Sequence, residues 1–504
     1  MTTPTTRTTD LKIPYSSCVL ERRPDPCAII IVGASGDLTS RKLIPSLFNL
    51  YTNGGLPEPF FIVGCARSRF ESSDFREKVK EDALKGSPAD ASRLADFLGY
   101  LHYHVIDYEE SASFDRLSEF LRSLEMRYPV AGNRIFYFAI PPTLYESTAR
   151  MLGSSGLAAE REDGSGWVRI VVEKPFGRDL DTAIALDTTL HAHFQEHQIF
   201  RIDHYLAKET VQNILMFRFA NAIFEPVWNR RYVSHIRIMA AETLGVEHRV
   251  GYYEGTGVLR DMFQNHMMQL LALTALEPPS RFEAERVRDE KTKTYRALRP
   301  FPVGRLNDAL VLGQYGAGRI NGKEVPAYRE EPKVDPESLT PTFASMRVFL
   351  DNWRWQGVPF YLTSGKRLPE KRTEITIHFK EVPHSMFRDT LGEHIPANQL
   401  TLGIYPDEKI YMTFQTKNPG ARVCLRSVTM DFNYHQDYSG PVLDAYEKVL
   451  LDCMLGDQML FWRQDGVELC WSFLTPILRE CESCGDRAKN LLPYASGTWG
   501  PEAP

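Results

Sequence analysis

The chain has 504 residues, which is more than one hydrophobic core normally organises, so at least two domains are expected. Its 59 basic and 65 acidic residues leave a net charge of -6, and this balance argues against a nucleic-acid-binding or anionic-membrane surface. No apolar run approaches the roughly 18 residues of a membrane span, and the first ten residues contain no signal-peptide core. We therefore expect a cytoplasmic protein with a disordered leader over residues 1–25.

The cysteines are scattered, which is typical of free thiols in a reducing compartment. Eight occur in the whole chain, and Cys481 and Cys484 form a single CxxC pair. Zinc sites of this type normally need a second pair. We therefore predict no metal site.

An apolar run, a glycine turn and a helical pattern open the ordered part of the chain. Residues 28–32 are apolar and Ile-rich, and they lead into Gly33-Ala34-Ser35-Gly36-Asp37-Leu38. Strand, glycine turn and helix form the dinucleotide-binding opening. Gly33 suits the tight turn, and Gly36 allows the main chain to approach a pyrophosphate at the helix N-terminus. Because only two glycines are present, with GxxG spacing, a purely structural turn is the alternative.

The second apolar run, residues 60–63, is followed by two arginines. An NAD-specific fold usually has an acid at this point, where it binds the ribose hydroxyl. Here Arg67 and Arg69 flank a serine. A guanidinium group favours an additional 2'-phosphate, so the sequence favours NADP over NAD.

Further strand-like runs alternate with helical patterns in the N-terminal half. The runs are residues 102–106, 134–140 and 167–172, and the helical patterns include residues 114–126. Repeated βαβ units predict a parallel, doubly wound, Rossmann-like sheet that binds ligands at the carboxyl ends of its strands. We assign this α/β domain to residues 26–200.

The C-terminal half changes its periodicity. Apolar and polar residues alternate in segments 236–238, 375–379 and 410–414, whereas residues 443–454 and 467–477 have helical patterns. Alternation of this kind predicts a large, mainly antiparallel sheet with one covered face. We therefore expect an α+β domain over residues 201–504, with a site at the junction of the two domains.

Residues 201–209 read Arg-Ile-Asp-His-Tyr-Leu-Ala-Lys-Glu. If they form a helix, His204 and Lys208 project from one face and Tyr205 lies one step round. An imidazole, an ammonium and a phenol that converge are suited to a phosphate monoester. The alternative is a solvated helix with an internal Glu/Lys pair.

The segment 257–270 contains a candidate general base. His266 falls on the apolar stripe of Phe263 and Leu270, which is also the pattern of a core histidine. Asp261 lies five residues earlier, about 140° round an ideal α-helix, so contact requires Asp261 at the helix entrance or help from elsewhere. A carboxylate in contact would fix the imidazole tautomer and stabilise the cation formed when His266 takes a proton.

Three further polar positions are candidates for ligand contact. Lys174 follows a strand and precedes a proline, where a nicotinamide or a substrate oxygen can lie. Glu242 ends a strand and can accept bonds from a sugar hydroxyl. Lys366 begins a run of four basic residues within 364–372 that offers a basic wall for an anion. For each of them, a solvated surface residue is the alternative.

Four motifs, in this order, resemble the glucose-6-phosphate dehydrogenase family. They are residues 33–38, 173–180 and 201–209, and Arg260-Asp261 with Asn265-His266, and the similarity extends from about Pro26 to Pro501. The resemblance implies an oxidoreductase that uses NADP to oxidise glucose 6-phosphate at C1 to the 6-phosphogluconolactone. That reaction is the first step of the oxidative pentose phosphate pathway. It also implies a homodimer or a homotetramer.

The resemblance implies a role for each matched residue. His266 would be the base that removes the C1 hydroxyl proton, with Asp261 as its partner. The residues implied in sugar-phosphate binding are Lys42, Lys174, His204, Tyr205, Lys208, Glu242, Asp261, Lys366 and Lys371. Those implied in cofactor binding are Gly33, Ser35, Gly36, Asp37, Leu38, Arg67, Tyr145 and Lys174.

Two alternatives remain open at this point. A dehydrogenase of a non-phosphorylated sugar is suggested by Glu173-Lys174-Pro175, a tripeptide that resembles one in the glucose-fructose oxidoreductase family. A catalytically silent NADP-binding sensor would retain the glycine turn and Arg67 but would need no base. Both leave part of the pattern unexplained, since the first has no use for the basic cluster and the second has none for His266.

Overall fold

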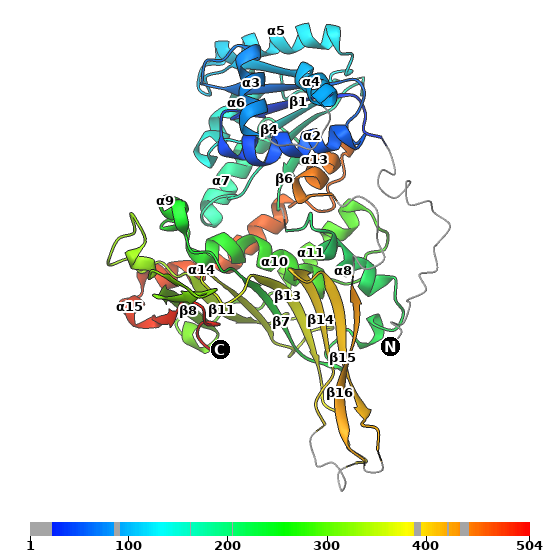
Figure 1. The fold of residues 1–504 in the computed structure, drawn as a ribbon, viewed down its shortest axis with the longest axis vertical. Coiled ribbons are helices and arrows are strands. Elements are labelled where there is room, and N and C mark those ends of the chain that lie inside the picture. Colours follow the sequence, from blue (N-terminus) through cyan, green and yellow to red (C-terminus); the bar gives the residue numbers. More distant parts are fainter. Residues whose placement is uncertain are drawn as a thin grey trace.

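The computed structural model describes residues 23–84, 91–161, 163–203, 205–387, 395–420, 423–433 and 443–504. The predicted leader therefore lies almost entirely outside the described residues. Two sheets organise the rest, one in the upper domain of Figure 1 and one in the lower domain, with a layer of helices between them.

The first sheet has six parallel strands in the order β3-β2-β1-β4-β5-β6. This is the strand order of the dinucleotide-binding fold. Strands β1 and β2 are buried along their whole length, because helices cover both faces of the sheet. The prediction of a parallel, doubly wound sheet is confirmed. The strands are β1 (Cys27–Val32), β2 (Phe60–Ala66), β3 (Leu101–Val105), β4 (Arg134–Phe138), β5 (Val168–Val172) and β6 (Ile199–Arg201).

The helices around this sheet bury apolar residues three and four positions apart. In α5 (Ser111–Arg127), Phe114, Leu117, Leu121 and Leu124 face the core and polar residues face solvent. The helix after the glycine turn begins with a π-helical segment, Thr39–Leu43, before α2. The others are α2 (Ile44–Thr52), α3 (Ser72–Asp82), α4 (Ala91–Gly99), α6 (Tyr145–Ser154) and α7 (Leu180–His191).

The second sheet has nine strands in the order β16-β15-β14-β13-β7-β12-β11-β8-β17. Neighbouring strands are antiparallel except in the pairs β7–β12 and β8–β17. In β13, Ile375 and Ile377 are fully buried while their neighbours are partly exposed, which confirms the predicted alternation. The strands are β7 (Val233–Ala241), β8 (Leu310–Gly316), β11 (Phe343–Val348), β12 (Phe360–Gly365), β13 (Arg372–Phe379), β14 (Gln399–Tyr405), β15 (Lys409–Lys417), β16 (Leu425–Asn433) and β17 (Leu491–Ala495). A separate small hairpin is formed by β9 (Gly318–Ile320) and β10 (Lys323–Val325).

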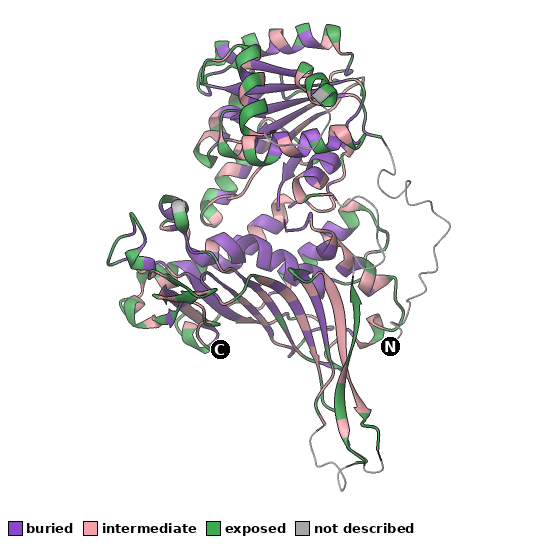
Figure 2. Cartoon of the chain, in the orientation of Figure 1, coloured by how far each residue is buried: buried purple, intermediate pink, exposed green. Residues whose placement is uncertain are grey.

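A helical layer separates the second sheet from the first domain (Figure 1). Its central helix, α10, is buried along its whole length, and Figure 2 shows this helix as the centre of the buried layer. A helix that is apolar all round must have protein on every side. The helices of this domain are α8 (Glu209–Phe219), α9 (Val250–Tyr253), the π-helix Leu259–Met267, α10 (Met268–Ala275), α11 (Ala284–Arg296), α14 (Gln464–Ser483) and α15 (Arg487–Asn490).

The C-terminal part of the chain returns to the first domain. Helix α13 (Ala445–Leu455) packs beside α2, and its Val449 and Leu450 are buried in the core of the first domain. The guanidinium group of Arg169 in β5 donates hydrogen bonds to the carbonyl oxygens of Cys453 (2.7 Å) and Met454 (2.8 Å). The apolar face of α13 therefore fastens the two domains together.

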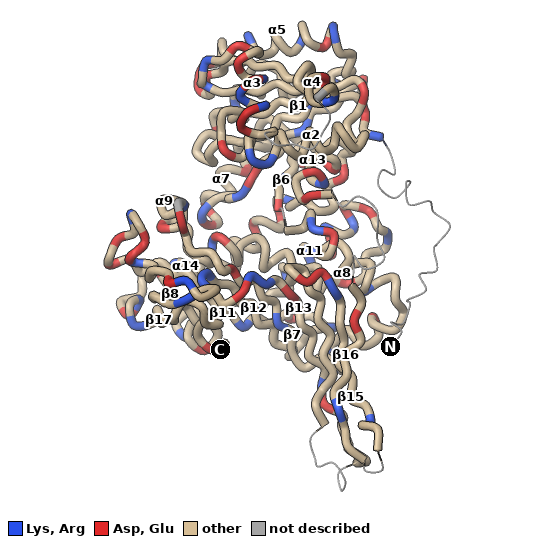
Figure 3. The backbone as a smooth tube through the Cα atoms, in the orientation of Figure 1, with Lys and Arg blue, Asp and Glu red and all other residues tan. Residues whose placement is uncertain are grey.

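Charged residues of both signs are interspersed over both domains (Figure 3). Among the residues that the structure describes, no helix is both long enough and apolar enough to cross a membrane.

Candidate active site

The glycine turn lies at the carboxyl end of β1. Gly33 has a φ of 100°, and a Cβ atom there would lie 2.2 Å from the carbonyl oxygen of Ala139, so only glycine fits. The Gly36 amide closes the turn on the Gly33 carbonyl oxygen at 2.9 Å. Ser35 and Asp37 are exposed at this edge, and Asp37 pairs with Arg41 (2.6 Å). Leu38 lies at the start of the π-helical segment, as the N-cap residue.

Arg67 follows directly after β2, the strand next to β1 in the sheet. Its side chain is exposed, and its guanidinium carbon lies 5.6 Å from the centre of the Tyr108 ring. A cation at the carboxyl edge of β2 is placed for the phosphate on the ribose of a dinucleotide held at the end of β1. The residues present at this edge therefore fit NADP.

Tyr145, which was predicted to line the cofactor, is buried next to the segment that carries Lys174. Only 1% of the residue is exposed, and its hydroxyl group donates a hydrogen bond to the carbonyl oxygen of Glu173 (3.0 Å). The hydroxyl group of Tyr137 donates to the Glu173 carboxylate (2.6 Å). The two tyrosines thus hold the side chain and the backbone of Glu173, the residue immediately before Lys174.

The described residues of 201–208 are not helical, which corrects the geometry predicted from the sequence. Arg201 ends β6, the described residues between it and α8 form turns, and Lys208 is the N-cap residue of α8. His204 lies outside the described residues. The side chain of Asp203 accepts a hydrogen bond from the Tyr205 amide (3.0 Å), and this bond holds the turn.

His266 is paired with Asp203, a carboxylate that the sequence did not suggest as its partner. The distance from its Nδ1 to Asp203 Oδ1 is 2.6 Å, and only 1% of each side chain is exposed. The ring of Tyr205 stacks on the imidazole ring, with centroids 4.0 Å apart. The carboxylate fixes the tautomer in which Nδ1 carries the proton, and this leaves Nε2 as the acceptor.

Asp261 and His266 meet on the ammonium group of Lys174. Lys174 Nζ lies 2.8 Å from His266 Nε2 and 3.5 Å from Asp261 Oδ1. Asp261 and His266 both belong to the π-helix Leu259–Met267, not to an α-helix. A π-helix bonds residue i to i+5, so residues five apart lie near one face, whereas α-helical geometry separates them. The two side chains are thus linked through Lys174, which comes from elsewhere in the fold.

Burial and the neighbouring charges act on the pKa of His266 in opposite directions. Burial lowers the pKa of His266 below its usual value, while the Asp203 carboxylate acts in the opposite direction. Burial alone would raise the pKa of Asp261, but the ammonium groups of Lys174 and Lys366 outweigh it and lower the pKa to about 2. At neutral pH the site therefore contains a neutral imidazole and an ionised Asp261 carboxylate.

A second cluster of cations lies around Tyr405. Lys371 Nζ is 4.4 Å and Lys208 Nζ is 5.7 Å from the centre of the Tyr405 ring, and Lys208 also lies 4.2 Å from the Tyr205 ring. Burial and then the Lys371 ammonium group lower the pKa of Lys208 to about 8. Two ammonium groups that repel each other favour a shared anion.

Glu242 and Lys366 form an ion pair at the ends of adjacent strands, β7 and β12. Lys366 Nζ also lies 5.1 Å from the centre of the Tyr253 ring. These residues therefore lie together, as a sugar-binding role requires. Lys42 is exposed on the first domain, and its ammonium group lies 5.9 Å from the Tyr446 ring of α13.

Sequence reasoning missed Asp203 and Tyr405. Asp203 stands inside the stretch 201–209, but its alignment with His266 comes from a turn and from a contact across 63 residues of sequence. Tyr405 ends β14, and no local pattern marks it. Both depend on tertiary contacts.

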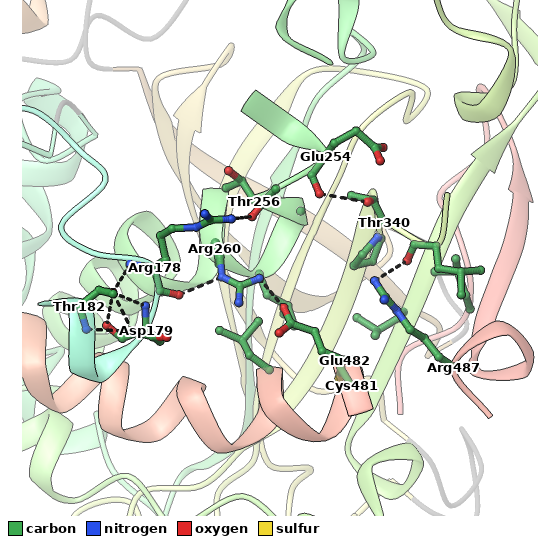
Figure 4. Close-up of a pocket in the computed structure, with 18 residues that line it drawn as sticks. Arg178, Asp179, Thr182, Glu254, Thr256, Arg260, Thr340, Cys481, Glu482 and Arg487 are labelled. Carbon is green, nitrogen blue, oxygen red and sulfur yellow. Dashed lines mark hydrogen bonds and ion pairs between the residues drawn. The ribbon is translucent and has the colours of Figure 1, made fainter. Parts of the chain in front are cut away.

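A cavity of about 620 Å³ adjoins the π-helix but contains none of the predicted site residues (Figure 4). Its charged groups are already engaged: Arg260 donates to Glu482 (2.6 Å), and Arg178 donates to the Gly255 carbonyl oxygen (3.2 Å). Figure 4 shows Arg260 of the π-helix bonded both to the Arg178 carbonyl oxygen, in the segment after β5, and to Glu482 of α14. The pairs hold the π-helix between the two domains.

The fold is that of a dinucleotide-dependent oxidoreductase, and its site contains a buried histidine paired with a carboxylate and a nearby cluster of ammonium groups. Family models match almost the whole described chain. "Glucose-6-phosphate dehydrogenase, NAD binding domain" matches residues 30–213, and "Glucose-6-phosphate dehydrogenase, C-terminal domain" matches residues 215–504.

Known proteins agree with these models. Glucose-6-phosphate 1-dehydrogenase of Aggregatibacter actinomycetemcomitans is 46% identical over 481 residues, 95% of each chain. That of Bacillus subtilis is 42% identical over 487 residues, 96% of this chain and 97% of the relative. A solved structure described as glucose-6-phosphate dehydrogenase in complex with its substrate glucose-6-phosphate has a TM-score of 0.87 and 35% identity, and covers 95% of this chain and 96% of its own. The chain belongs to the glucose-6-phosphate dehydrogenase family, and its cofactor is NADP.

Proposed function

We propose that this protein oxidises glucose 6-phosphate at C1 with NADP, through His266 as the general base. The products are 6-phosphoglucono-1,5-lactone and NADPH, and the reaction is the first step of the oxidative pentose phosphate pathway. Family membership supports the overall reaction. The observation that carries the proposed chemistry is the contact of His266 with Asp203 on one nitrogen and with Lys174 on the other.

The tautomer of His266 determines how the proton moves. Because Asp203 holds the proton on Nδ1, Nε2 is free of a proton and accepts the one on the C1 hydroxyl group. The imidazolium that forms lies against Asp203, which offsets its charge in the buried site. Lys174 Nζ, now 2.8 Å from Nε2, marks the position that the C1 oxygen takes. Lys174 must therefore move aside and can donate to that oxygen instead.

The cationic cluster takes the other end of the sugar. We assign the 6-phosphate to Lys208, Lys371 and Tyr205, with His204 from the same stretch. Glu242, Asp261 and Lys366 are assigned to the hexose hydroxyl groups. A dianionic phosphate near Lys208 and Lys371 relieves the repulsion that lowers the pKa of Lys208. The separation of this cluster from His266 supports recognition of a sugar that carries its charge away from the reacting carbon.

NADP, when bound, supplies the carbon that accepts the hydride from C1. Gly33, Gly36 and Ser35 are assigned to its pyrophosphate and Arg67 to its 2'-phosphate. Lys42, Asp37 and Leu38 are assigned to the same edge of the first domain. Tyr145 is assigned an indirect role: its hydroxyl group holds the Glu173 carbonyl oxygen, next to Lys174.

The decisive experiment compares the His266→Asn variant with the wild type in NADP reduction. We expect kcat to fall by about 10²–10⁴-fold while glucose 6-phosphate still binds, because general-base catalysis contributes that much. A Thr373→Ser variant, next to the cationic cluster, is the control for local disturbance. Normal turnover with weakened sugar binding would refute the assignment of the base.

A substrate comparison separates the remaining alternatives. Glucose 6-phosphate should be turned over and free glucose almost not at all, because free glucose leaves the cationic cluster unused. Equal turnover of glucose would instead favour a dehydrogenase of non-phosphorylated sugars. Unchanged properties in His266→Asn would favour a silent NADP sensor.

We also propose that the protein is a cytoplasmic homodimer or homotetramer. All seven cysteines among the described residues are free thiols, which suits a reducing compartment. An apolar groove runs along β14, β15 and β16, where Ile223 is 75% and Met430 66% exposed. Exposed patches of this size mark protein interfaces. Sedimentation equilibrium tests the assembly: a monomer at micromolar concentration would contradict it, and Met430→Glu should shift any dimer towards monomer.

A further inference from the structure

The segment after β5, residues 174–178, is attached to the π-helix at both of its ends. At one end, the Lys174 ammonium group donates to the Asp261 carbonyl oxygen (3.2 Å). At the other end, the Arg178 carbonyl oxygen accepts a hydrogen bond from Arg260 Nε (2.9 Å). Because Arg260 and Asp261 are neighbours in the chain, both attachments lead to one point on the helix that carries the proposed base.

The two attachments differ in kind. Lys174 holds the π-helix with a side chain that must move aside when the sugar reaches His266, so this contact changes during the proposed reaction. Arg260 instead holds a backbone carbonyl oxygen, and our assignment gives it no contact with the sugar or with NADP. The Arg260 bond is therefore the one that can persist while Lys174 exchanges partners.

A second bond fixes the direction of the Arg260 side chain, of which 19% is exposed. Its Nη1 donates to Glu482 Oε1 (2.6 Å), and Figure 4 shows the guanidinium group between this carboxylate and the Arg178 carbonyl oxygen. A guanidinium group suits this position because its planar fork of donors can serve two acceptors at once. The Arg178 guanidinium group in turn donates to the Gly255 carbonyl oxygen, shortly before the π-helix (3.2 Å).

One face of α14 supports the same part of the chain. Trp471 Nε1 donates to the Phe176 carbonyl oxygen (2.8 Å), and the Thr475 hydroxyl group accepts from the Leu180 amide (3.0 Å). Thr475 and Glu482 follow Trp471 at positions that lie only about 40° and 20° from it round an ideal α-helix. Glu482 therefore belongs to a row of side chains that already holds this segment.

The cavity of about 620 Å³ lies beside this attachment and is lined by Arg178, Arg260 and Glu482. Space next to a backbone segment allows it to shift without a steric clash, whereas a close-packed core does not. The position of the segment on this side therefore depends on directed hydrogen bonds, of which Arg260 makes two.

We propose that Arg260 is a positioning residue for the proposed reaction: it keeps the segment that carries Lys174 in place against the helix of His266 while Lys174 exchanges partners. The inference rests on the proposed roles of Lys174 and His266. Arg260 acts through the backbone of Arg178, and Glu482 orients it. Its loss should lower kcat more than it raises the KM for glucose 6-phosphate, because a misplaced group at the reacting atom costs turnover.

The first test measures kcat and KM in Arg260→Met and Arg260→Lys. Methionine removes both bonds, and we expect kcat to fall by about 10- to 100-fold with KM changed by less than about threefold. Lysine lacks the planar fork, so its kcat should lie between those of Arg260→Met and the wild type. Arg479→Met is the matched control on α14, since Arg479 pairs with Asp181 at the exposed surface (2.8 Å), and it should retain the wild-type kcat.

A double-mutant cycle distinguishes positioning from general support of the fold. In a Lys174→Met background no ammonium group remains to be positioned, so Arg260→Met should cause little further loss of kcat. A general structural defect would instead lower kcat by the same factor in both backgrounds. Equal losses in the two backgrounds, or wild-type kcat in Arg260→Met, would overturn the inference.

Hydrogen exchange provides a readout that does not depend on turnover. Peptides that cover residues 174–180 should exchange faster in Arg260→Met and in Glu482→Gln than in the wild type or Arg479→Met. Unchanged exchange in both variants would also overturn the inference. If Arg260→Met does not fold, Arg260→Lys replaces it in the cycle and in the exchange measurement. Failure of the proposed function is recognised separately, by a wild type inactive on glucose 6-phosphate or by normal turnover in His266→Asn.

Discussion

Asp203→Asn is the substitution that tests the catalytic pair most directly. Asparagine keeps the volume of the side chain, and its oxygen can still accept the Tyr205 amide, so the turn should survive. What is lost is the negative charge 2.6 Å from His266 Nδ1. Because the charge stabilises the imidazolium formed in the reaction, the variant should retain binding and lose turnover.

The size of the effect follows from the type of interaction. A hydrogen bond to a charged group contributes about 1.5–3 kcal/mol, which corresponds to about 10- to 150-fold in kcat. The loss should therefore be smaller than the 10²–10⁴-fold expected for removal of the base itself. Since both partners are 1% exposed, solvent screening does not reduce this value much.

The pH profile gives an independent sign. Asp203 raises the pKa of His266 against the effect of burial. Its removal should therefore move the acid limb of kcat/KM to lower pH. The assay is initial-rate NADPH absorbance from about pH 5 to pH 9, with saturating NADP.

Asp351→Asn is the matched control, since that carboxylate pairs with Arg299 at the surface (2.7 Å) and is 44% exposed. It should change neither kcat nor the profile. Wild-type turnover in Asp203→Asn, or an acid limb that moves to higher pH, would refute the reasoning.

Three other substitutions test the remaining assignments. Arg67→Ala should raise the KM for NADP far more than that for NAD, because only NADP carries the 2'-phosphate; an equal change for both would remove the assignment. The affinity for glucose 6-phosphate should weaken above about pH 8, where Lys208 loses its proton, and Lys208→Arg should abolish that weakening; titration calorimetry across this range decides. Gly33→Ala should reduce NADP binding and lower Tm, since its Cβ would lie 2.2 Å from the Ala139 carbonyl oxygen; wild-type values in fluorescence titration and calorimetry would contradict this steric account.

The predicted elements that depend on local pattern agree well with the structure. The apolar run before Gly33 forms β1, and the run at residues 60–63 forms the first part of β2. The alternating residues around Ile375 form β13. These patterns succeed because a strand or helix must bury its apolar residues on a fixed period, whatever the rest of the chain does. The parallel class of the first sheet follows from the same patterns.

The predictions that depended on geometry were less reliable. Residues 201–209 have a composition suited to a phosphate site, yet Tyr205, Leu206 and Ala207 form a turn before α8. Helix α13, far along the chain in the predicted second domain, packs on the first domain. In both cases, packing against a distant segment outweighs local propensity.

The sequence by itself therefore determined the two sheets, the glycine turn, the preference for NADP and the choice of His266 as the candidate base. Only the tertiary structure decided its partners. A π-helix turns Asp261 and His266 towards Lys174, and Asp203 reaches His266 from 63 residues earlier in the chain. The physical reason is that side-chain period is a local property, whereas the hydrogen bonds that fix a tautomer join atoms brought together by folding.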